Sequence, residues 1–111
     1  MIVRKPSIFI YVSDPDPDFL REICAGIEEE GVFWEVFSRD GKDADVSALA
    51  FEAAKDSMLG SGIGIRGVDV AMQMQGLPRG KNVEQYHMPT YAQCRKVGAN
   101  SARAIKKMAF K

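Results

Sequence analysis

The sequence predicts an α/β domain in which helices flank a mixed five-stranded sheet whose fourth strand is antiparallel. Strand and helix patterns alternate through the first half of the chain, which favours parallel pairing through helical crossovers. Only Gly67 separates the third strand pattern from the fourth, and so short a connection cannot make a parallel crossover. The chain of 111 residues suffices for one compact core, so a single domain over residues 1–111 is expected.

The first strand and helix come from residues 7–31. Residues 7–12, SIFIYV, form a short apolar run that is typical of a buried strand. Prolines and aspartates at 14–18 break this run and favour a turn into a helix. The helix is predicted from Phe19 to Glu30, and Gly31 supplies its end. Its apolar face consists of Phe19, Leu20, Ile23 and Ile27.

A second strand and a second helix follow. Residues 32–37, VFWEVF, predict the strand, and the polar segment 38–45 predicts a loop. Asp45 is suited to cap the helix, because a short acidic side chain accepts hydrogen bonds from the amides of the first turn. The helix ends before Gly60 and Ser61. Its apolar face consists of Val46, Leu49, Ala50, Ala53 and Ala54.

The second half of the chain predicts three strands in succession and a final helix. Residues 62–66 and 68–75 predict the third and fourth strands, and 83–88 predict a weaker fifth. Apolar side chains alternate with other residues along 68–75, which predicts one buried face. Residues 90–107 are helical in character, with an expected break near Gly98.

Composition excludes several classes of protein. Lys and Arg total 15 and Asp and Glu total 15, so the chain lacks the basic excess of a nucleic-acid-binding protein. Two isolated cysteines, Cys24 and Cys94, indicate an intracellular protein and not a disulfide scaffold. Residues 1–6 are too short and polar for a signal peptide, and no apolar run approaches the roughly 20 residues of a membrane span. A cytoplasmic protein without membrane or nucleic-acid partners is therefore expected.

Residues 62–67 spell G-x-G-x-x-G, the pattern of a dinucleotide-binding loop. That function requires the glycines to lie between a strand and a helix, so that the pyrophosphate meets the helix N-terminus. Here the glycines lie inside an apolar strand pattern and a further strand follows. The run is better interpreted as a glycine-rich strand that another backbone approaches closely.

His87 is the one histidine of the chain, and it lies seven residues before Cys94. No neighbouring pattern completes a zinc site, and nothing in the sequence orients the pair for nucleophilic catalysis. No catalytic and no cofactor-binding residues are predicted.

The run Glu28, Glu29, Glu30 ends the first predicted helix. Carboxylates at a helix C-terminus oppose the partial negative charge of that end, which costs a few tenths of a kcal/mol each. The run is either a solvated helix end or a group of carboxylates presented to a cation or a basic partner. The basic residues near the chain end are interpreted as a solvated helix face: Arg95, Lys96, Arg103, Lys106, Lys107 and Lys111.

Three motifs in sequence order resemble a known family. Residues 26–32, GIEEEGV, are similar to the G-I-E-E-E-G-[IV] signature in small subunits of glycerol and diol dehydratase reactivases. The run GIGI at 62–65 precedes a hairpin strand and Leu77-Pro78. Residues 95–103, RKVGANSAR, match the family's R-x-x-G-x-N-[AS]-A-R stretch, and Phe110 stands near the end. The resemblance spans nearly the whole chain and implies a three-layer α/β/α fold.

The resemblance implies a non-catalytic, chaperone-like subunit. In that family a large subunit carries an actin-like ATPase, and the small subunit binds it in an α2β2 complex. The small subunit leaves when the large one engages an inactivated B12-dependent glycerol or diol dehydratase, and damaged cobalamin is then released. Such an exchange is driven by differences in binding free energy. The expected location is cytoplasmic, and association with a bacterial microcompartment stays open.

The same resemblance assigns a role to the acidic run. A glutamate of that run contributes to a Mg2+ site at the interface with the large subunit, and Glu29 occupies the matching position. Mg2+ commonly takes only one or two carboxylates from a protein, which suits a shared site. Glu29 is therefore the expected metal ligand, Glu28, Glu29 and Glu30 are the expected partner interface, and the isolated chain is expected to bind no cofactor.

Two other functions stay open. The family is related to the medium subunit of B12-dependent dehydratases, so the first alternative is a fragment or variant of that subunit, which would make the chain a component of the enzyme itself. Medium subunits are usually longer, which favours the reactivase. A stand-alone nucleotide-binding domain is disfavoured, because Asp14-Pro15-Asp16-Pro17 stands where a glycine loop would follow the first strand. Whether the chain alone forms a homodimer, and which substrate its dehydratase prefers, are not decided by the sequence.

Overall fold

A computed structural model describes residues 5–39, 45–78 and 80–107. The predicted order of strands and helices is confirmed along these residues. Element ends differ from the expected positions by one or two residues, except that α2 ends at Asp56, three residues earlier than predicted. The elements are β1 (Ile8–Ser13), α1 (Pro17–Glu29), β2 (Trp34–Ser38), α2 (Val46–Asp56), β3 (Ser61–Arg66), β4 (Asp69–Met74), β5 (Glu84–His87) and α3 (Tyr91–Lys106).

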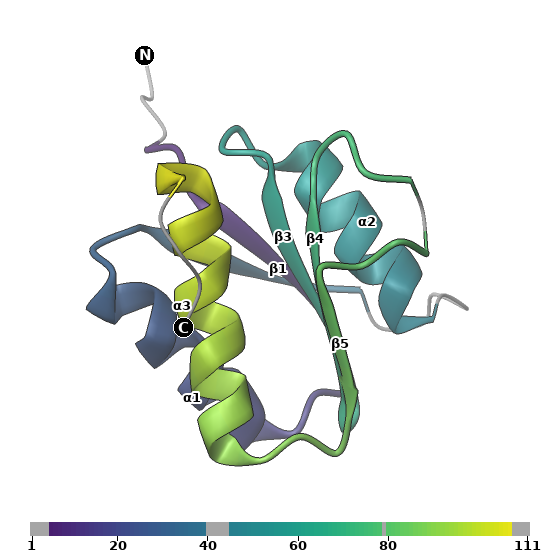
Figure 1. The fold of residues 1–111 in the computed structure, drawn as a ribbon. Helices are drawn as coiled ribbons and strands as arrows, with labels where there is room; N and C mark the ends of the chain where they lie inside the picture. Colours follow the sequence, from purple (N-terminus) through teal and green to yellow (C-terminus); the bar gives the residue numbers. More distant parts are fainter. Residues whose placement is uncertain (1–4, 40–44, 79, 108–111) are drawn as a thin grey trace.

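The strands form one mixed sheet in the order β2-β1-β3-β4-β5. Strand β1 pairs in parallel with β2 and β3, while β4 pairs antiparallel with β3 and β5. Gly67 closes the β3–β4 turn with a φ of 58°, a conformation that glycine adopts without steric cost. Helices α1 and α3 cover one face and α2 covers the other (Figure 1). The three-layer α/β/α fold with an antiparallel fourth strand is confirmed.

Short polar side chains set where the helices begin. The Asp16 carboxylate accepts hydrogen bonds from the amides of Asp18 at 2.9 Å and Phe19 at 3.1 Å. Pro17 occupies the first helical position, where its missing N–H is not needed. Helix α1 therefore starts two residues before the predicted Phe19. The predicted cap Asp45 is confirmed, since its carboxylate accepts from the Ala48 amide at 2.8 Å.

The predicted break near Gly98 is wrong, because α3 is continuous from Tyr91 to Lys106. Gly98 lies where α3 crosses α1, and a Cβ there would collide with the Ile23 carbonyl group. Gly26 stands opposite on α1, where a Cβ would collide with the Arg95 carbonyl. The two glycines let the helix backbones touch, so Gly98 serves helix packing and does not end the helix.

Strand β3 shows the same use of glycine. A Cβ on Gly64 would lie 2.6 Å from the Ala50 nitrogen and 2.6 Å from the Val46 oxygen, both in α2. A Cβ on Gly62 would likewise collide with the α2 backbone at Ala53 and Ala54. The G-x-G-x-x-G run is therefore a strand against which α2 packs closely, as the sequence predicted.

Strand β4 is buried more completely than its alternation predicted. Val70 and Met72 are buried on one face as expected, yet Ala71 and Gln73 are also buried. The single-face prediction is wrong because α2 covers the second face of this strand. The Gln73 amide is satisfied internally, since it donates to the Pro78 carbonyl and accepts from the Met74 amide.

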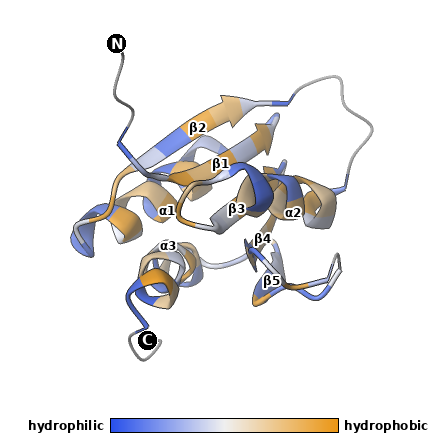
Figure 2. Ribbon diagram, turned by 90° about the horizontal axis from the view of Figure 1, so that it is seen from above, coloured by the Kyte–Doolittle hydropathy of each residue, from blue (hydrophilic) through white to orange (hydrophobic). Residues whose placement is uncertain are grey.

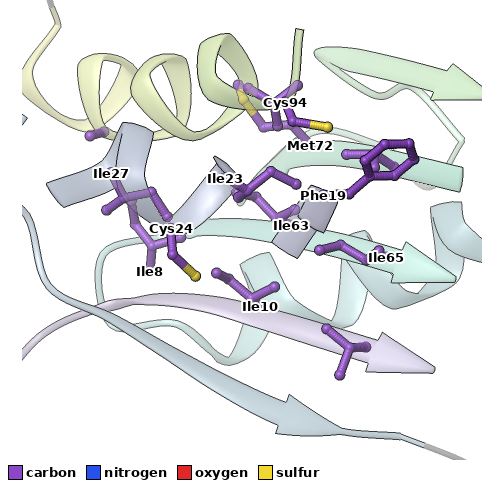
Figure 3. Packing of buried hydrophobic residues seen from close by; sticks show 14 residues of the cluster. Ile8, Ile10, Phe19, Ile23, Cys24, Ile27, Ile63, Ile65, Met72 and Cys94 are labelled. Atoms are coloured by element: carbon purple, nitrogen blue, oxygen red, sulfur yellow. The ribbon is translucent and has the colours of Figure 1, made fainter. Parts of the chain in front are cut away.

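The main core lies between the sheet and the helix pair α1–α3. No helix among the described residues is both long and apolar enough to cross a membrane. Hydrophobic segments also run along β1 and the edge strand β2 (Figure 2). Figure 3 shows the packed side chains, which include Ile10, Ile63 and Ile65 from the strands and Phe19, Ile23 and Ile27 from α1.

Candidate partner-binding surface

The close α1–α3 crossing brings an arginine of α3 between two glutamates of α1. The Arg95 guanidinium lies 2.7 Å from the Glu22 carboxylate and 2.5 Å from the Glu29 carboxylate. Its hydrogen bond to Glu22, and then that to Glu29, raise the pKa of Arg95 above its ordinary value. The Glu29 carboxylate is therefore paired with Arg95 and also accessible to solvent, since its side chain is 48% exposed.

Glu30 is the most enclosed of the three consecutive glutamates. Its side chain is 9% exposed and lies 3.3 Å from Arg103 and 3.9 Å from Lys106. The Lys106 ammonium also donates to the Glu30 carbonyl, at the end of α1 where backbone carbonyls have no amide of a following helical turn to bind. Glu30 therefore links the C-terminal ends of α1 and α3. Because its side chain is enclosed, its main role is to stabilise this helix pair.

Glu28 points to the opposite flank of α1. Its carboxylate accepts a hydrogen bond from the Trp34 indole at 3.2 Å, at the start of the edge strand β2. A groove of about 360 Å³ runs beside it between α1 and β2, and its lining is mainly apolar. A second hollow of about 460 Å³ continues past Glu28 and Trp34 to Phe33, whose side chain is 55% exposed.

The structure thus separates the three predicted interface glutamates. Glu29 and Glu30 turn to α3, whereas Glu28 borders an open apolar groove. Among the residues described by the structure, no cluster of three or more His, Cys, Asp or Glu side chains could hold a metal ion. Glu29 offers one half-exposed carboxylate next to an arginine, so a Mg2+ ion there would need most of its ligands from elsewhere.

The prediction that the basic residues near the chain end form a solvated helix face is only partly correct. Arg95, Arg103 and Lys106 form ion pairs with α1, while Lys96 and Lys107 are exposed and Lys111 lies outside the described residues. The spacing held a signal for this pairing. Arg95, Arg103 and Lys106 recur at i, i+8 and i+11, which places them on one helix face.

The remaining singled-out side chains are apart from this surface. The His87 imidazole lies 2.5 Å from the Asp69 carboxylate on the β4–β5 hairpin. Cys94 is fully buried in α3, and burial raises the pKa of its thiol to about 11. A thiol with so high a pKa is almost entirely protonated near neutral pH, so Cys94 is a packing residue.

Fold and surface together define a class: a small three-layer α/β domain that presents a charged helix end beside an apolar groove. Such a surface is typical of a protein-binding module. The family model described as dehydratase medium subunit matches residues 5–111, and the chain belongs to that family.

Two solved structures are similar over the whole chain. One is titled "Structure of diol dehydratase-reactivating factor complexed with ADP and Mg2+"; it has a TM-score of 0.87 and 28% identity, covering 97% of this chain and 99% of that one. The other is titled "Glycerol dehydratase reactivase"; it has a TM-score of 0.86 and 28% identity, covering 96% and 97%. The resemblance seen in the motifs is confirmed.

The fold explains the motif residues that carry that resemblance. Gly26 and Gly98 permit the helix crossing, and Arg95 and Arg103 reach the glutamates of α1. Asn100 is buried and donates to the Glu84 carboxylate at 3.1 Å, which ties α3 to β5. These motif residues mainly build the α1–α3 pair, and Glu28 and Glu29 are the motif carboxylates that it leaves exposed.

Proposed function

We propose that this chain is the small subunit of a reactivating factor for a B12-dependent glycerol or diol dehydratase. The observation that carries the proposal is the end-to-end match with chains from two such factors, which leaves almost nothing unmatched on either side. The family model alone would also suit a medium subunit of the dehydratase itself. That alternative is not favoured, because both similar structures are reactivating factors.

The proposed role is accessory and requires no catalysis by this chain. The chain binds a large subunit that carries the ATPase, in an α2β2 complex, and leaves when the large subunit engages the inactivated dehydratase. Damaged cobalamin is then released. The open groove between α1 and β2 supports this role, since exchange of partners needs a preformed surface for which two proteins can compete. The proposed location is the cytoplasm.

We assign the contact with the large subunit to the exposed end of α1, at Glu28 and Glu29. In the proposed complex Glu29 contributes one oxygen ligand to a Mg2+ ion shared with the large subunit. When bound, such an ion would supply positive charge beside the Glu29 carboxylate. Arg95 holds Glu29 at one carboxylate oxygen and so orients it, and the 48% exposure of the side chain leaves it within reach of a partner.

The test is assembly with the reactivase large subunit, followed by native mass spectrometry with Mg2+ or with EDTA. Glu29→Gln keeps the side-chain shape and removes the charge. Glu22→Gln is the matched control, because Glu22 binds the same Arg95 but is only 23% exposed. We expect Glu29→Gln to raise the dissociation constant of the complex about tenfold or more, and only when Mg2+ is present.

The outcomes separate the two parts of the proposal. Equal weakening by Glu22→Gln would show that Arg95 orientation matters and not a metal ligand. A complex that survives Glu29→Gln unchanged would keep the function and remove Glu29 from it. If no complex forms, the reactivase assignment fails, and assembly with dehydratase large and small subunits becomes the next test.

A further inference from the structure

The edge strand β2 has hydrogen-bonding groups that face away from the sheet. The Phe33 carbonyl and the Arg39 amide bind β1, at 2.9 and 2.7 Å. In a parallel ladder these contacts come from alternate residues, so the backbones of Trp34 and Val36, which lie between, point outward. In the part of the chain that the structure describes, β1 is the only strand beside β2.

The side of α1 that lies over β2 carries its charged and apolar side chains in a regular order. Arg21, Cys24, Ala25 and Glu28 line the groove at i, i+3, i+4 and i+7, which makes one continuous stripe. The centre of the stripe is small and apolar, and its two ends carry opposite charges. The Trp34 indole binds Glu28, so the negative end of the stripe lies at the start of β2. Arg21, seven residues earlier in α1, lines the same groove together with Val36.

We propose that the occupant of this edge is a second copy of the chain, paired antiparallel through β2 about a twofold axis at Val36. Both Val36 residues would then exchange N–H···O=C hydrogen bonds, and the two sheets would become one continuous sheet. A twofold axis perpendicular to the sheet keeps the two α1 helices on the same face, where they would lie antiparallel and side by side.

Charge complementarity selects a second copy as the partner. Arg21 and Glu28 stand at opposite ends of the stripe that lines the groove with Val36, so a twofold axis that crosses the middle of the stripe would place Arg21 of each copy opposite Glu28 of the other. Arg21 also binds Asp18 at 2.7 Å, but a guanidinium has five donors and can accept a second carboxylate. The formal net charge of zero means that two copies do not repel each other as wholes.

The register is also compatible along the strand. Glu35 would lie opposite Phe37, so no two glutamates face each other across the junction. The exposed Phe33 of each copy would lie opposite Arg39 of the other, whose guanidinium already lies 4.0 Å over the Tyr11 ring of its own chain, so this pair brings no like charges together. This inference does not rest on the proposed reactivase function, since it concerns the isolated chain.

The experiment is sedimentation velocity on the isolated chain over a concentration series. Val36→Pro removes an outward N–H without removing a bond to β1, and proline is tolerated on edge strands. Arg21→Glu and Glu28→Arg each place like charges opposite one another, and the double variant restores the pairing. Lys96→Glu is the control, a charge reversal on the exposed face of α3.

We expect a dimer whose dissociation constant rises about tenfold or more in each single charge variant, because every contact occurs twice. The double variant should recover dimerisation, and Lys96→Glu should leave it unchanged. Circular dichroism identifies any variant that fails to fold. A chain that is monomeric at all concentrations would overturn the proposal. So would a dimer insensitive to both Val36→Pro and Arg21→Glu.

Discussion

The two flanks of α1 differ although they belong to one helix. The flank toward α3 is closed by backbone contact at Gly26 and by ion pairs from Arg95. The flank toward β2 is an open groove lined by Cys24 and Ala25. The carboxylates of this helix are therefore not equivalent. Carboxylates on the closed flank hold two helices together, and the one on the open flank borders a surface that a partner can cover.

The largest loss of stability is expected from a substitution on the closed flank, where the backbones of α1 and α3 are in contact. Gly98→Ala places a methyl group against the Ile23 carbonyl, which backbone packing on both sides prevents from moving away. We expect a loss of about 3 kcal/mol or more in the free energy of unfolding, since overpacking against backbone exceeds ordinary core strain. Urea unfolding followed by circular dichroism measures it.

Ala25→Leu is the matched enlargement on the open flank. The added atoms enter the groove beside Arg21 and Glu28, so the free energy of unfolding should change by about 1 kcal/mol or less. If both variants lose equal stability, the two flanks are equally packed and the comparison is wrong.

Much of the fold could be predicted from the sequence because its signals are local. The Gly67 turn alone decided that β4 is antiparallel, and Asp45 marked the start of α2. Gly98 was misjudged for a physical reason. A glycine within a helix looks like a weak point by intrinsic propensity, and only the position of Ile23, 75 residues away in the chain, shows that it permits close packing.

The candidate surface was less predictable, because its contacts are distant in sequence. The acidic run was correctly placed at the end of a helix, but nothing local shows that Glu29 faces Arg95 while Glu28 faces Trp34. Crossing angle and helix rotation decide these pairings, and both follow from tertiary packing. The family motif identified the residues without revealing that most of them maintain the helix pair.

A second, smaller effect distinguishes the two cysteines from ordinary thiols. Burial, and then the charge of Glu28, raise the pKa of Cys24 to about 12, and burial raises that of Cys94 to about 11. At pH 8 a disulfide reagent should therefore react at least about a hundredfold more slowly than with an unfolded thiol, because only the thiolate attacks. The absorbance of the released chromophore measures this rate.

The raised pKa values of the two thiols determine how the free energy of unfolding changes with pH. The neutral buried thiols contribute stability that is fully present below pH 9, the ordinary thiol pKa, and lost as pH rises through 11 to 12. Reaction in urea at pH 8 should be fast for both residues. Rapid labelling of the folded chain at pH 8 would mean that the groove beside Cys24, or the α1–α3 layer around Cys94, opens far more often than this packing implies.

The smallest expected effect compares glutamates from the two flanks. Glu30→Gln removes the charge that Arg103 and Lys106 share, in a side chain only 9% exposed, and should cost about 1 to 2 kcal/mol of unfolding free energy. Glu28→Gln should cost less than about 0.5 kcal/mol, because its indole contact is exposed and an amide oxygen can still accept it. Urea unfolding of both variants at pH 7, repeated in 1 M NaCl, measures the difference. Salt should reduce the cost of Glu30→Gln only in part, since screening acts weakly on enclosed charges. Equal costs for the two variants would place Glu30 in the same open environment as Glu28, and the distinction between a structural and a partner-facing carboxylate would then fail.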